Sequence, residues 1–383
     1  MLAAVESSAR GILISVFPIV MYRTLGDAET VSEVYLLIGI LSFLAALVTP
    51  WVARFIPRRW LYTIATLGMM CGALFSACGG VWSVAAGLAL MTVATVVVTV
   101  CFNAYVMDYI KRSALGACET LRLFYSGTAW TVGPFLGVWL MDWWFPAPFI
   151  VSAVASIILL VVFWVLRLGN GKLITRARAE APNPLAYLHR FMKQPRLIVG
   201  WTFAVVRSCG WWVYVVYLPI YAVESGLSDQ LGGIVLSISN GFLFLTPLML
   251  KWMRGHVRYA VKVGFLGSGL CFLMASVFTF NASLAICVLV FASLFLILLD
   301  VCAGLPFLMA VKPSERTEMS AVYSTFRDVS GVVAPGAVRI VLLVAPLPVV
   351  FAATACGLFA TAILAARLHP RLGNRKIVAL GIR

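Results

Sequence analysis

The sequence predicts an all-α polytopic membrane protein with about twelve transmembrane helices. Of its 383 residues, 62% are hydrophobic and only 11% are charged. A soluble chain of this size could not hide so much apolar surface, because the face that it presents to water has to be polar. The apolar runs are about 20 residues long, which is the length of helix that crosses a bilayer core of about 30 Å.

The chain also repeats itself at an interval of about 200 residues, which predicts two pseudo-symmetric six-helix bundles. Pro18 and Pro219 stand 201 residues apart, and Pro134 and Pro335 keep the same interval. Proline matches of this kind fall in four predicted helices of each half, with small drifts between them. We interpret them as the mark of a duplicated chain.

The spans follow one another in two sets of six, each recognised by its apolar length. The first set lies at residues 2–23, 31–53, 60–80, 83–109, 116–140 and 146–167. The second set lies at residues 197–222, 230–251, 260–280, 283–310, 318–341 and 345–367. We therefore divide the chain into an N-terminal bundle (1–167), a basic linker (168–196), a C-terminal bundle (197–370) and a tail (371–383).

The linker is polar, and its segment from Pro184 to Met192 is predicted to form a short amphipathic helix on the membrane surface,. Lys and Arg residues gather in the linker, the tail and alternate loops, whereas the opposite loops carry acids such as Asp27 and Asp142. Because basic loops face the cytoplasm, we expect both termini to be cytoplasmic, in the plasma membrane of a bacterium, that is, its inner membrane. The net charge of +15 follows from the same rule and indicates no nucleic-acid partner,.

Two short motifs carry a resemblance to a known family. The loop after the second span reads Ala53-Arg54-Phe55-Ile56-Pro57-Arg58-Arg59, and the fifth span contains Gly133-Pro134-Phe135-Leu136-Gly137. With two six-span halves and a basic linker, the chain resembles the major facilitator superfamily of secondary transporters. The loop keeps the basic residues of the family's motif, but Ala53 replaces its acidic residue. The second motif is similar to the G-P-x-x-G signature of proton-antiporting members.

The resemblance implies that spans 1, 4, 7 and 10 line a central cavity. Charges at bilayer depth cost about 2.5–3.5 kcal/mol or more, so each one suggests a function. The deepest acid, Asp300, lies 12 residues before Lys312, which places it about 18 Å from the cytoplasmic end of its helix. We predict that Asp300 couples transport to protons, together with Arg327, Asp328 and Glu119. The alternative is a permanent ion pair between Asp300 and Arg327.

Substrate contacts are predicted on the other cavity helices. Arg10 and Arg207 lie inside the first and seventh spans, where a guanidinium suits a carboxylate or phosphate ligand,. Trp211 and Tyr214 share a helix face with Arg207,, and Asn103 lies in the fourth span. These five residues are the predicted substrate-binding set.

Other interpretations of these residues remain open. Arg10 can pair with Glu6 one turn away, and Arg207 can pair with Asp300,. The aromatic residues of the seventh span are also consistent with helix packing and with an interfacial belt.

A gate is predicted at the cytoplasmic side. In the family, a similar acid near the base of the fourth span meets the arginine of the loop between the second and third spans and latches the cytoplasmic gate. Here the corresponding residues are Asp108 and Arg54. Arg122 on the fifth span is a second possible partner of Asp108, and it can also pair with Glu119,.

These features together predict a secondary active transporter that works by alternating access, without a cofactor or metal site. The first choice is a proton-coupled exporter of small organic solutes, and the alternative is a proton-coupled uptake symporter for an organic anion. Its partners would be the solute, protons and the lipid bilayer, and we expect a monomer. A membrane enzyme is disfavoured because no nucleophile motif, phosphate loop or His/Cys/Asp cluster is present in the sequence,. A channel is disfavoured because the sequence has no filter-like loop between its spans. A scaffold is disfavoured because it would not need paired charges in six helices on the side of the cavity.

Overall fold

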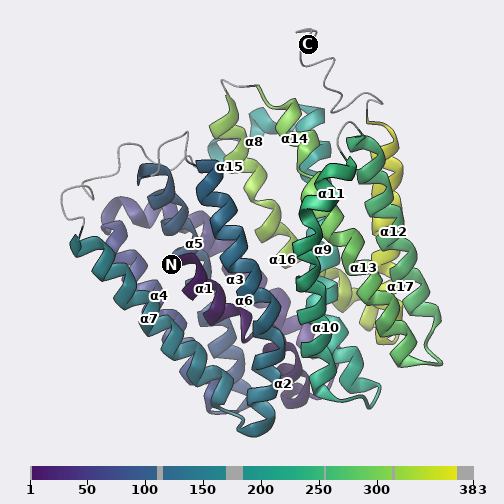
Figure 1. Ribbon diagram of the computed structural model, residues 1–383, viewed down its shortest axis with the longest axis horizontal. Coiled ribbons are helices and arrows are strands. Elements are labelled where there is room, and N and C mark those ends of the chain that lie inside the picture. The colour runs from purple at the N-terminus through teal and green to yellow at the C-terminus, as the bar shows by residue number, and fades with distance from the viewer. Residues whose placement is uncertain (1, 110–114, 170–183, 254–255, 313–314, 369–383) are drawn as a thin grey trace. The chain divides into compact units, whose positions relative to one another are not determined.

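The computed structural model describes residues 2–109, 115–169, 184–253, 256–312 and 315–368, and every regular element in these residues is a helix. The chain divides into two compact units. The first unit contains Met1–Asn183 and Gly226–Gly241, and the second contains Pro184–Ser225 and Phe242–Arg383 (Figure 1). Residues 170–183 and 369–383, which hold much of the predicted linker and tail, lie outside the described residues.

The first unit is a bundle of long helices that pack side by side. Its helices are α1 (Leu2–Gly11), α2 (Val16–Leu25), α3 (Ala28–Phe55), α4 (Arg58–Ala77), α5 (Val81–Tyr109), α6 (Leu115–Trp143), α7 (Ala147–Gly169) and α10 (Asp229–Gly241). Helix α4 packs against α5 and α7, and α1 packs against α6 and α7. Helix α10 packs against α6, far from it in sequence.

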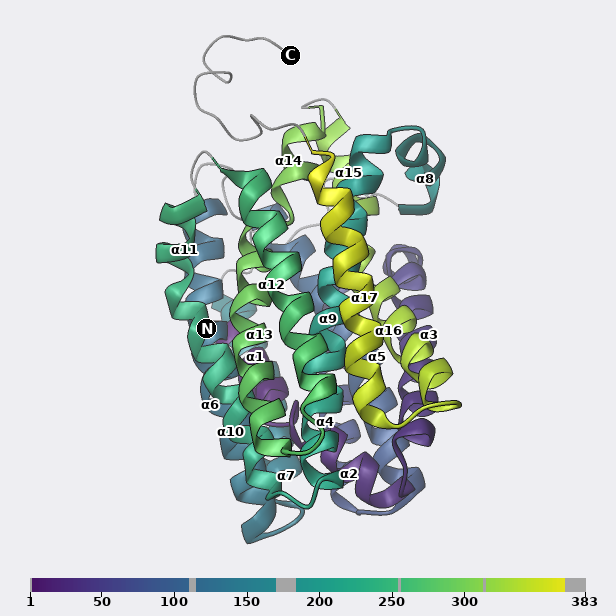
Figure 2. The same cartoon turned by 90° about the vertical axis from the view of Figure 1, so that its right-hand side faces the viewer.

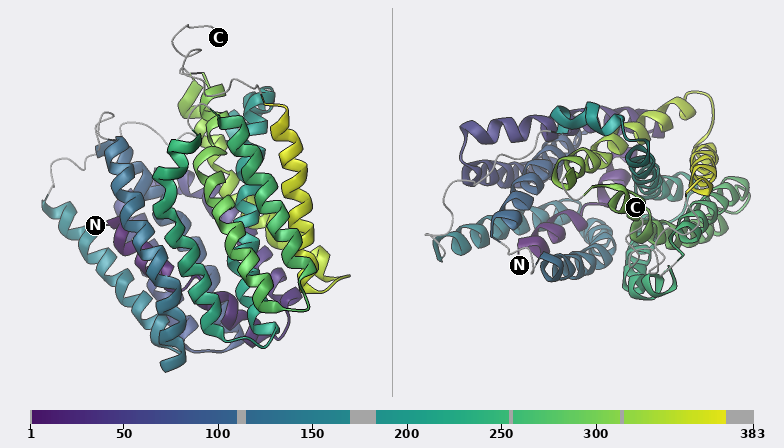
Figure 3. Two further views of the ribbon diagram at one scale, coloured as in Figure 1. Left: turned by 45° about the vertical axis from the view of Figure 1, so that its right-hand side comes forward. Right: turned by 90° about the horizontal axis from the view of Figure 1, so that it is seen from above.

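The second unit is built around α9, which contacts α13, α14, α16 and α17. Its helices are α8 (Pro184–Met192), α9 (Pro195–Glu224), the 3₁₀ turn η2 (Phe242–Leu245), α11 (Thr246–Met253), α12 (Val257–Val277), α13 (Ala282–Cys302), α14 (Leu305–Ala310), α15 (Arg316–Ser324), α16 (Phe326–Leu342) and α17 (Leu347–Ala366). Helix α12 packs between α13 and α17 (Figure 2). Two further views of the helices are given in Figure 3.

The predicted all-α polytopic fold is confirmed, because helix occupies each of the twelve predicted spans in the described residues. Ten of these spans are long and apolar enough to cross a membrane by length and composition alone. Helix α6 and the pair α15–α16 occupy the other two. Four spans, the first, eighth, tenth and eleventh, are interrupted along their length. The domain boundaries at 167 and 197 follow the sequence repeat and stay a prediction.

The first span is interrupted between α1 and α2, where residues 12–15 form a turn. Pro18 offers one cause, because it has no N–H and its ring clashes with the carbonyl of Ile14, four residues earlier. Proline alone is not sufficient, however. Pro219 occupies the same place in the second half of the repeat, yet it lies inside the continuous helix α9.

The difference lies in what packs against the turn. A Cβ built on Gly137 would lie 1.9 Å from the carbonyl oxygen of Ile12. One built on Gly133 would lie 2.5 Å from the carbonyl carbon of Gly11. Both glycines belong to α6, so this helix approaches the turn backbone to backbone. The repeat places Ala334 and Val338 at these two positions in the second half. Their side chains would prevent an equally close approach there.

Three spans meet at Pro134 in the middle of α6. The hydroxyl of Ser15, at the end of the turn, donates to the carbonyl oxygen of Pro134 over 2.8 Å. The next residue, Phe135, donates its backbone N–H to the hydroxyl of Ser237 on α10 over 3.0 Å. A Cβ on Gly233 of α10 would lie 2.7 Å from the Pro134 carbonyl oxygen. The glycine–proline motif of the fifth span is therefore the packing centre of the first unit.

The predicted linker helix is present as α8, and it is bound to the second unit at the end formed by α14 and α15 (Figures 1 and 2). Its Phe191 is buried in a cluster that includes Met319 of α15. Its Arg190 forms ion pairs with Glu315 at 2.5 Å and Glu318 at 3.2 Å. One face of α8 thus contacts protein, a contact that the amphipathic pattern alone did not predict.

Candidate functional site

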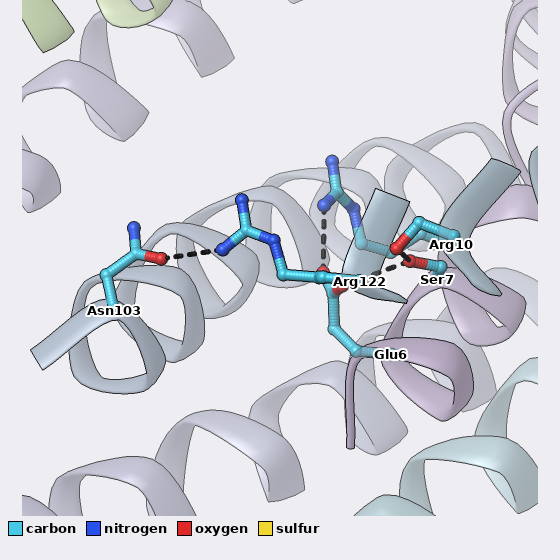
Figure 4. A network of polar contacts seen from close by, with 6 residues as sticks. Glu6, Ser7, Arg10, Asn103 and Arg122 are labelled. Carbon is cyan, nitrogen blue, oxygen red and sulfur yellow. Dashed lines mark hydrogen bonds and ion pairs between the residues drawn. The ribbon is translucent and has the colours of Figure 1, made fainter. Parts of the chain in front are cut away.

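Within the first unit, polar side chains of α1 and α6 contact one another (Figure 4). Arg10 and Glu6, one turn apart on α1, form an ion pair of 2.8 Å. Ser7 donates to Ser126 of α6 over 2.8 Å. The guanidinium of Arg10 also stands 5.3 Å from the ring centre of Trp130, which is cation–π distance,. The side chain of Arg10 keeps 35% of its surface exposed while it is paired.

In the same close-up, Arg122 of α6 donates to the side-chain oxygen of Asn103 on α5 over 3.0 Å (Figure 4). The structure thus joins a predicted gate residue to a predicted substrate residue. Asp108 and Glu119 lie on α5 and α6, but their side chains are outside the described residues. Arg54 is exposed in the last turn of α3. The latch between Asp108 and Arg54 or Arg122 therefore stays a prediction.

A second set of polar contacts joins the end of α2, the start of α10 and the end of α6 in the first unit. Arg23, in the last turn of α2, forms an ion pair with Asp229 in the first turn of α10. Gln230 donates its side-chain amide to Asp142 of α6 over 2.8 Å. These contacts hold α10 to α2 and α6. The sequence placed Arg23, Asp142 and Asp229 in or beside loops of the less basic side, without indicating that they meet.

In the second unit, the deepest predicted acid lies against two residues of α9. Asp300 on α13 has its Oδ1 3.1 Å from Nε of Arg207, and its Oδ2 accepts a hydrogen bond of 2.9 Å from the indole N–H of Trp211. The N–H of Arg207 Nε is not aligned for a hydrogen bond, so this contact is an ion pair. Arg207 and Trp211 are four residues apart and share one helix face. The Arg207 side chain is 11% exposed and that of Asp300 is 36% exposed, so the acid is the accessible partner.

The remaining predicted residues of this unit surround the pair. Of the two arginines suggested for Asp300, Arg207 forms the ion pair and Arg327 lies within electrostatic range. Asp328 lies in the first turn of α16, where a carboxylate is favoured by the helix dipole,. Tyr214 is fully buried and packs edge-on against Trp211 with ring centres 5.6 Å apart. In this state it supports Trp211 and does not form part of an open surface.

One residue of this site was missed by sequence reasoning. Phe326, the first residue of α16, has Arg207 5.1 Å and Arg327 5.6 Å from its ring centre. Its ring is buried, with 8% of its surface exposed. An aromatic residue next to an intramembrane Arg-Asp pair was the available signal, but periodicity assigns such a residue to packing.

The comparisons with known proteins agree with this architecture. A family model described as Major Facilitator Superfamily matches residues 1–335. The chain belongs to the major facilitator superfamily. The predicted resemblance is therefore confirmed, and this superfamily member is a membrane transporter rather than an enzyme.

Solved structures with a similar fold extend over almost the whole chain. A peptide transporter POT superposes with a TM-score of 0.77 at 15% identity, covering 97% of this chain and 94% of that one. A POT family transporter in complex with 5-aminolevulinic acid has a TM-score of 0.73 at 11% identity, covering 97% and 95%. The nucleoside transporter NupG has a TM-score of 0.70 at 14% identity, covering 95% and 96%. At these identities the likeness establishes the fold alone. Among curated proteins, no sequence matches this chain.

Proposed function

We propose that this superfamily member is a proton-coupled exporter of small organic solutes, in which Asp300 binds the proton. The observation that carries the proposal is the contact of Asp300 with Arg207 at 3.1 Å and with Trp211 at 2.9 Å. An ion pair inside a membrane is costly to form and is often part of a transport pathway. Here the acid remains accessible while its counter-ion is largely buried.

Proton binding at this pair would change the balance of charge around it. When Asp300 takes up a proton, the charge of Arg207 loses its carboxylate partner. An uncompensated buried charge costs about 3–5 kcal/mol, which is enough to favour a different conformation. Proton binding and a conformational change would be coupled in this way.

The polar network of the first unit supplies the proposed solute contacts. Arg10 presents a guanidinium beside the face of Trp130, and Asn103 lies next to Arg122. This combination of charge, amide and aromatic surface suits a small polar organic molecule. 5-Aminolevulinic acid, peptides and nucleosides, which are named for transporters of similar fold, are molecules of this class.

The proposal also includes the direction in which the solute is transported. Export by proton exchange is supported by the glycine–proline motif of the fifth span, although close packing against the turn of the first span also accounts for its glycines. Uptake of an organic anion with protons is the second candidate. It is favoured by the pairing of Arg10 and Arg207 with carboxylates, because a substrate carboxylate can take the place of either one,.

One reconstitution assay tests the coupling and the direction together. Purified protein in liposomes is offered 5-aminolevulinic acid, dipeptides and nucleosides under an imposed pH gradient. Proton exchange predicts accumulation when the lumen is acidic, whereas symport predicts accumulation when the outside is acidic. Asp300→Asn should abolish the response to the gradient but leave solute exchange. Asp27→Asn is the matched control, because Asn keeps the cap that Asp27 provides at the start of α3,. Gradient-driven transport that persists in Asp300→Asn would rule out this coupling site.

We also propose that the protein is a monomer in a bacterial inner membrane, with both termini in the cytoplasm. The orientation is supported by the Lys and Arg residues of the linker, the tail and alternate loops,. Reporter fusions at each terminus test the orientation. A terminus labelled from the outside of intact cells would contradict it.

A further inference from the structure

Phe326 contacts both arginines that surround the proposed coupling acid. The guanidinium of Arg207 lies 5.1 Å from its ring centre, and that of Arg327 lies 5.6 Å from it. The ring is wedged between helices, since it packs against Val205 of α9 and against Tyr323 at 5.3 Å. It therefore cannot turn away from the two cations without disturbing the packing.

We propose that Phe326 is a positioning residue, whose ring keeps Arg207 in place as its cation–π partner when Asp300 is protonated. The inference rests on the proposed function of Asp300 as the proton-binding group. It assigns Phe326 no contact with the solute and no proton of its own.

The ring of Phe326 acts on the charge of Arg207. The face of an aromatic ring is negative, so it attracts a cation without neutralising it. While Asp300 is ionised, Arg207 has a carboxylate at 3.1 Å and the ring is a secondary partner. Once Asp300 is protonated, the ring is the partner that remains at cation–π distance. Phe326 therefore stabilises the protonated state more than the ionised state and makes proton binding easier.

The other groups around Asp300 do not provide this effect. The titratable and charged groups that act on Asp300 or on one of the two arginines come from α9, α13, α15 and α16, namely Arg207, Cys302, Tyr323, Arg327 and Asp328. Two of these groups are the arginines themselves, and among the described contacts none of the other three presents a ring face to Arg207. A change confined to the ring of Phe326 should thus alter proton binding while it leaves these charges in place.

The test measures protonation of Asp300 directly and needs no solute. The full-length protein in lipid is titrated by infrared spectroscopy, and the carboxyl band of Asp300 is identified by its loss in Asp300→Asn. In Phe326→Leu we expect the midpoint of this band to move to lower pH by about 0.5 unit, equivalent to about 0.7 kcal/mol. Phe326→Tyr keeps the ring face and should keep the wild-type midpoint.

Two controls separate the ring's charge effect from its volume. Phe203→Leu removes another buried ring of the same unit, which packs against Phe265 and not against an arginine described here. Replacing Phe326 with trifluorophenylalanine keeps the shape but weakens the negative face, and it serves if Phe326→Leu does not fold. It should also lower the midpoint.

Each outcome decides the matter. A wild-type midpoint in both the leucine and the fluorinated protein, or an equal shift in Phe203→Leu, would overturn the role of Phe326 and leave the proposed function standing. If the wild-type protein shows no titrating band of Asp300, the proposed function fails, and the inference fails with it.

Discussion

The close packing of α6 against the turn of the first span leads to a sharp prediction at Gly137. An alanine Cβ at this position would lie 1.9 Å from the carbonyl oxygen and 2.9 Å from the carbonyl carbon of Ile12. These are backbone atoms, so they cannot rotate away as a side chain would. The helices would have to separate by about 1 Å before the contact became tolerable. Overpacking of this kind costs about 1–3 kcal/mol.

The matched control lies ten residues earlier on the same helix. A Cβ on Gly127 meets nothing within 4 Å. Both substitutions gain the same helix propensity, about 1 kcal/mol for alanine over glycine. The difference between the two variants therefore isolates the clash, and Gly137→Ala should unfold with a free energy about 1–3 kcal/mol below that of Gly127→Ala. Thermal unfolding in detergent, followed by tryptophan fluorescence, measures the difference. Equal melting temperatures would refute the proposed backbone contact.

Two further predictions concern polar contacts. Ser15→Ala removes the buried hydrogen bond to the Pro134 carbonyl, and it should cost about 1 kcal/mol in the same unfolding assay,; an unchanged melting temperature would contradict this. At the linker helix, hydrogen bonds from Gln194 and then Arg190 hold the pKa of the Glu315 carboxyl below its usual range. The ionised Glu315 stabilises the contact at pH values above the ordinary carboxyl pKa. This stabilisation is lost as pH falls through the lowered pKa, so acidification should release α8. Arg190→Ala should release it at neutral pH as well. If proteolysis of α8 responds to neither change, the ion pairs of Arg190 with Glu315 and Glu318 do not hold α8 in place.

The fold was largely predictable from the sequence because membrane insertion depends on a local property. The second span was expected at 31–53 and is formed by α3 (Ala28–Phe55), and the others agree in the same way. A run of apolar residues must form a helix in a bilayer, since no water is present to satisfy its backbone groups. The helix ends differ by a few residues because capping groups, such as Asp27 at α3, extend a helix beyond its apolar core,.

The candidate site was predictable as a set of residues but not as a set of contacts. The cost of burying charge identified Asp300, Arg207 and Arg10. Which arginine pairs with Asp300 depends on the separation of α9, α13 and α16, and the sequence left Arg207 and Arg327 both open. The ring of Phe326 was missed because a hydrophobic residue inside a span carries no local sign of a cationic partner.

The two halves of the repeat separate what the sequence determines from what the tertiary structure determines. The sequence by itself established the twelve apolar spans, the duplicated prolines and the membrane-embedded charges, because each is a property of a short stretch of chain. It could not decide that the first span breaks near Pro18 while the seventh continues through Pro219. That outcome depends on how closely another helix approaches the backbone. The absence of side chains at Gly133 and Gly137 allows α6 to reach the turn, and such a contact between segments far apart in the chain exists only in the tertiary structure.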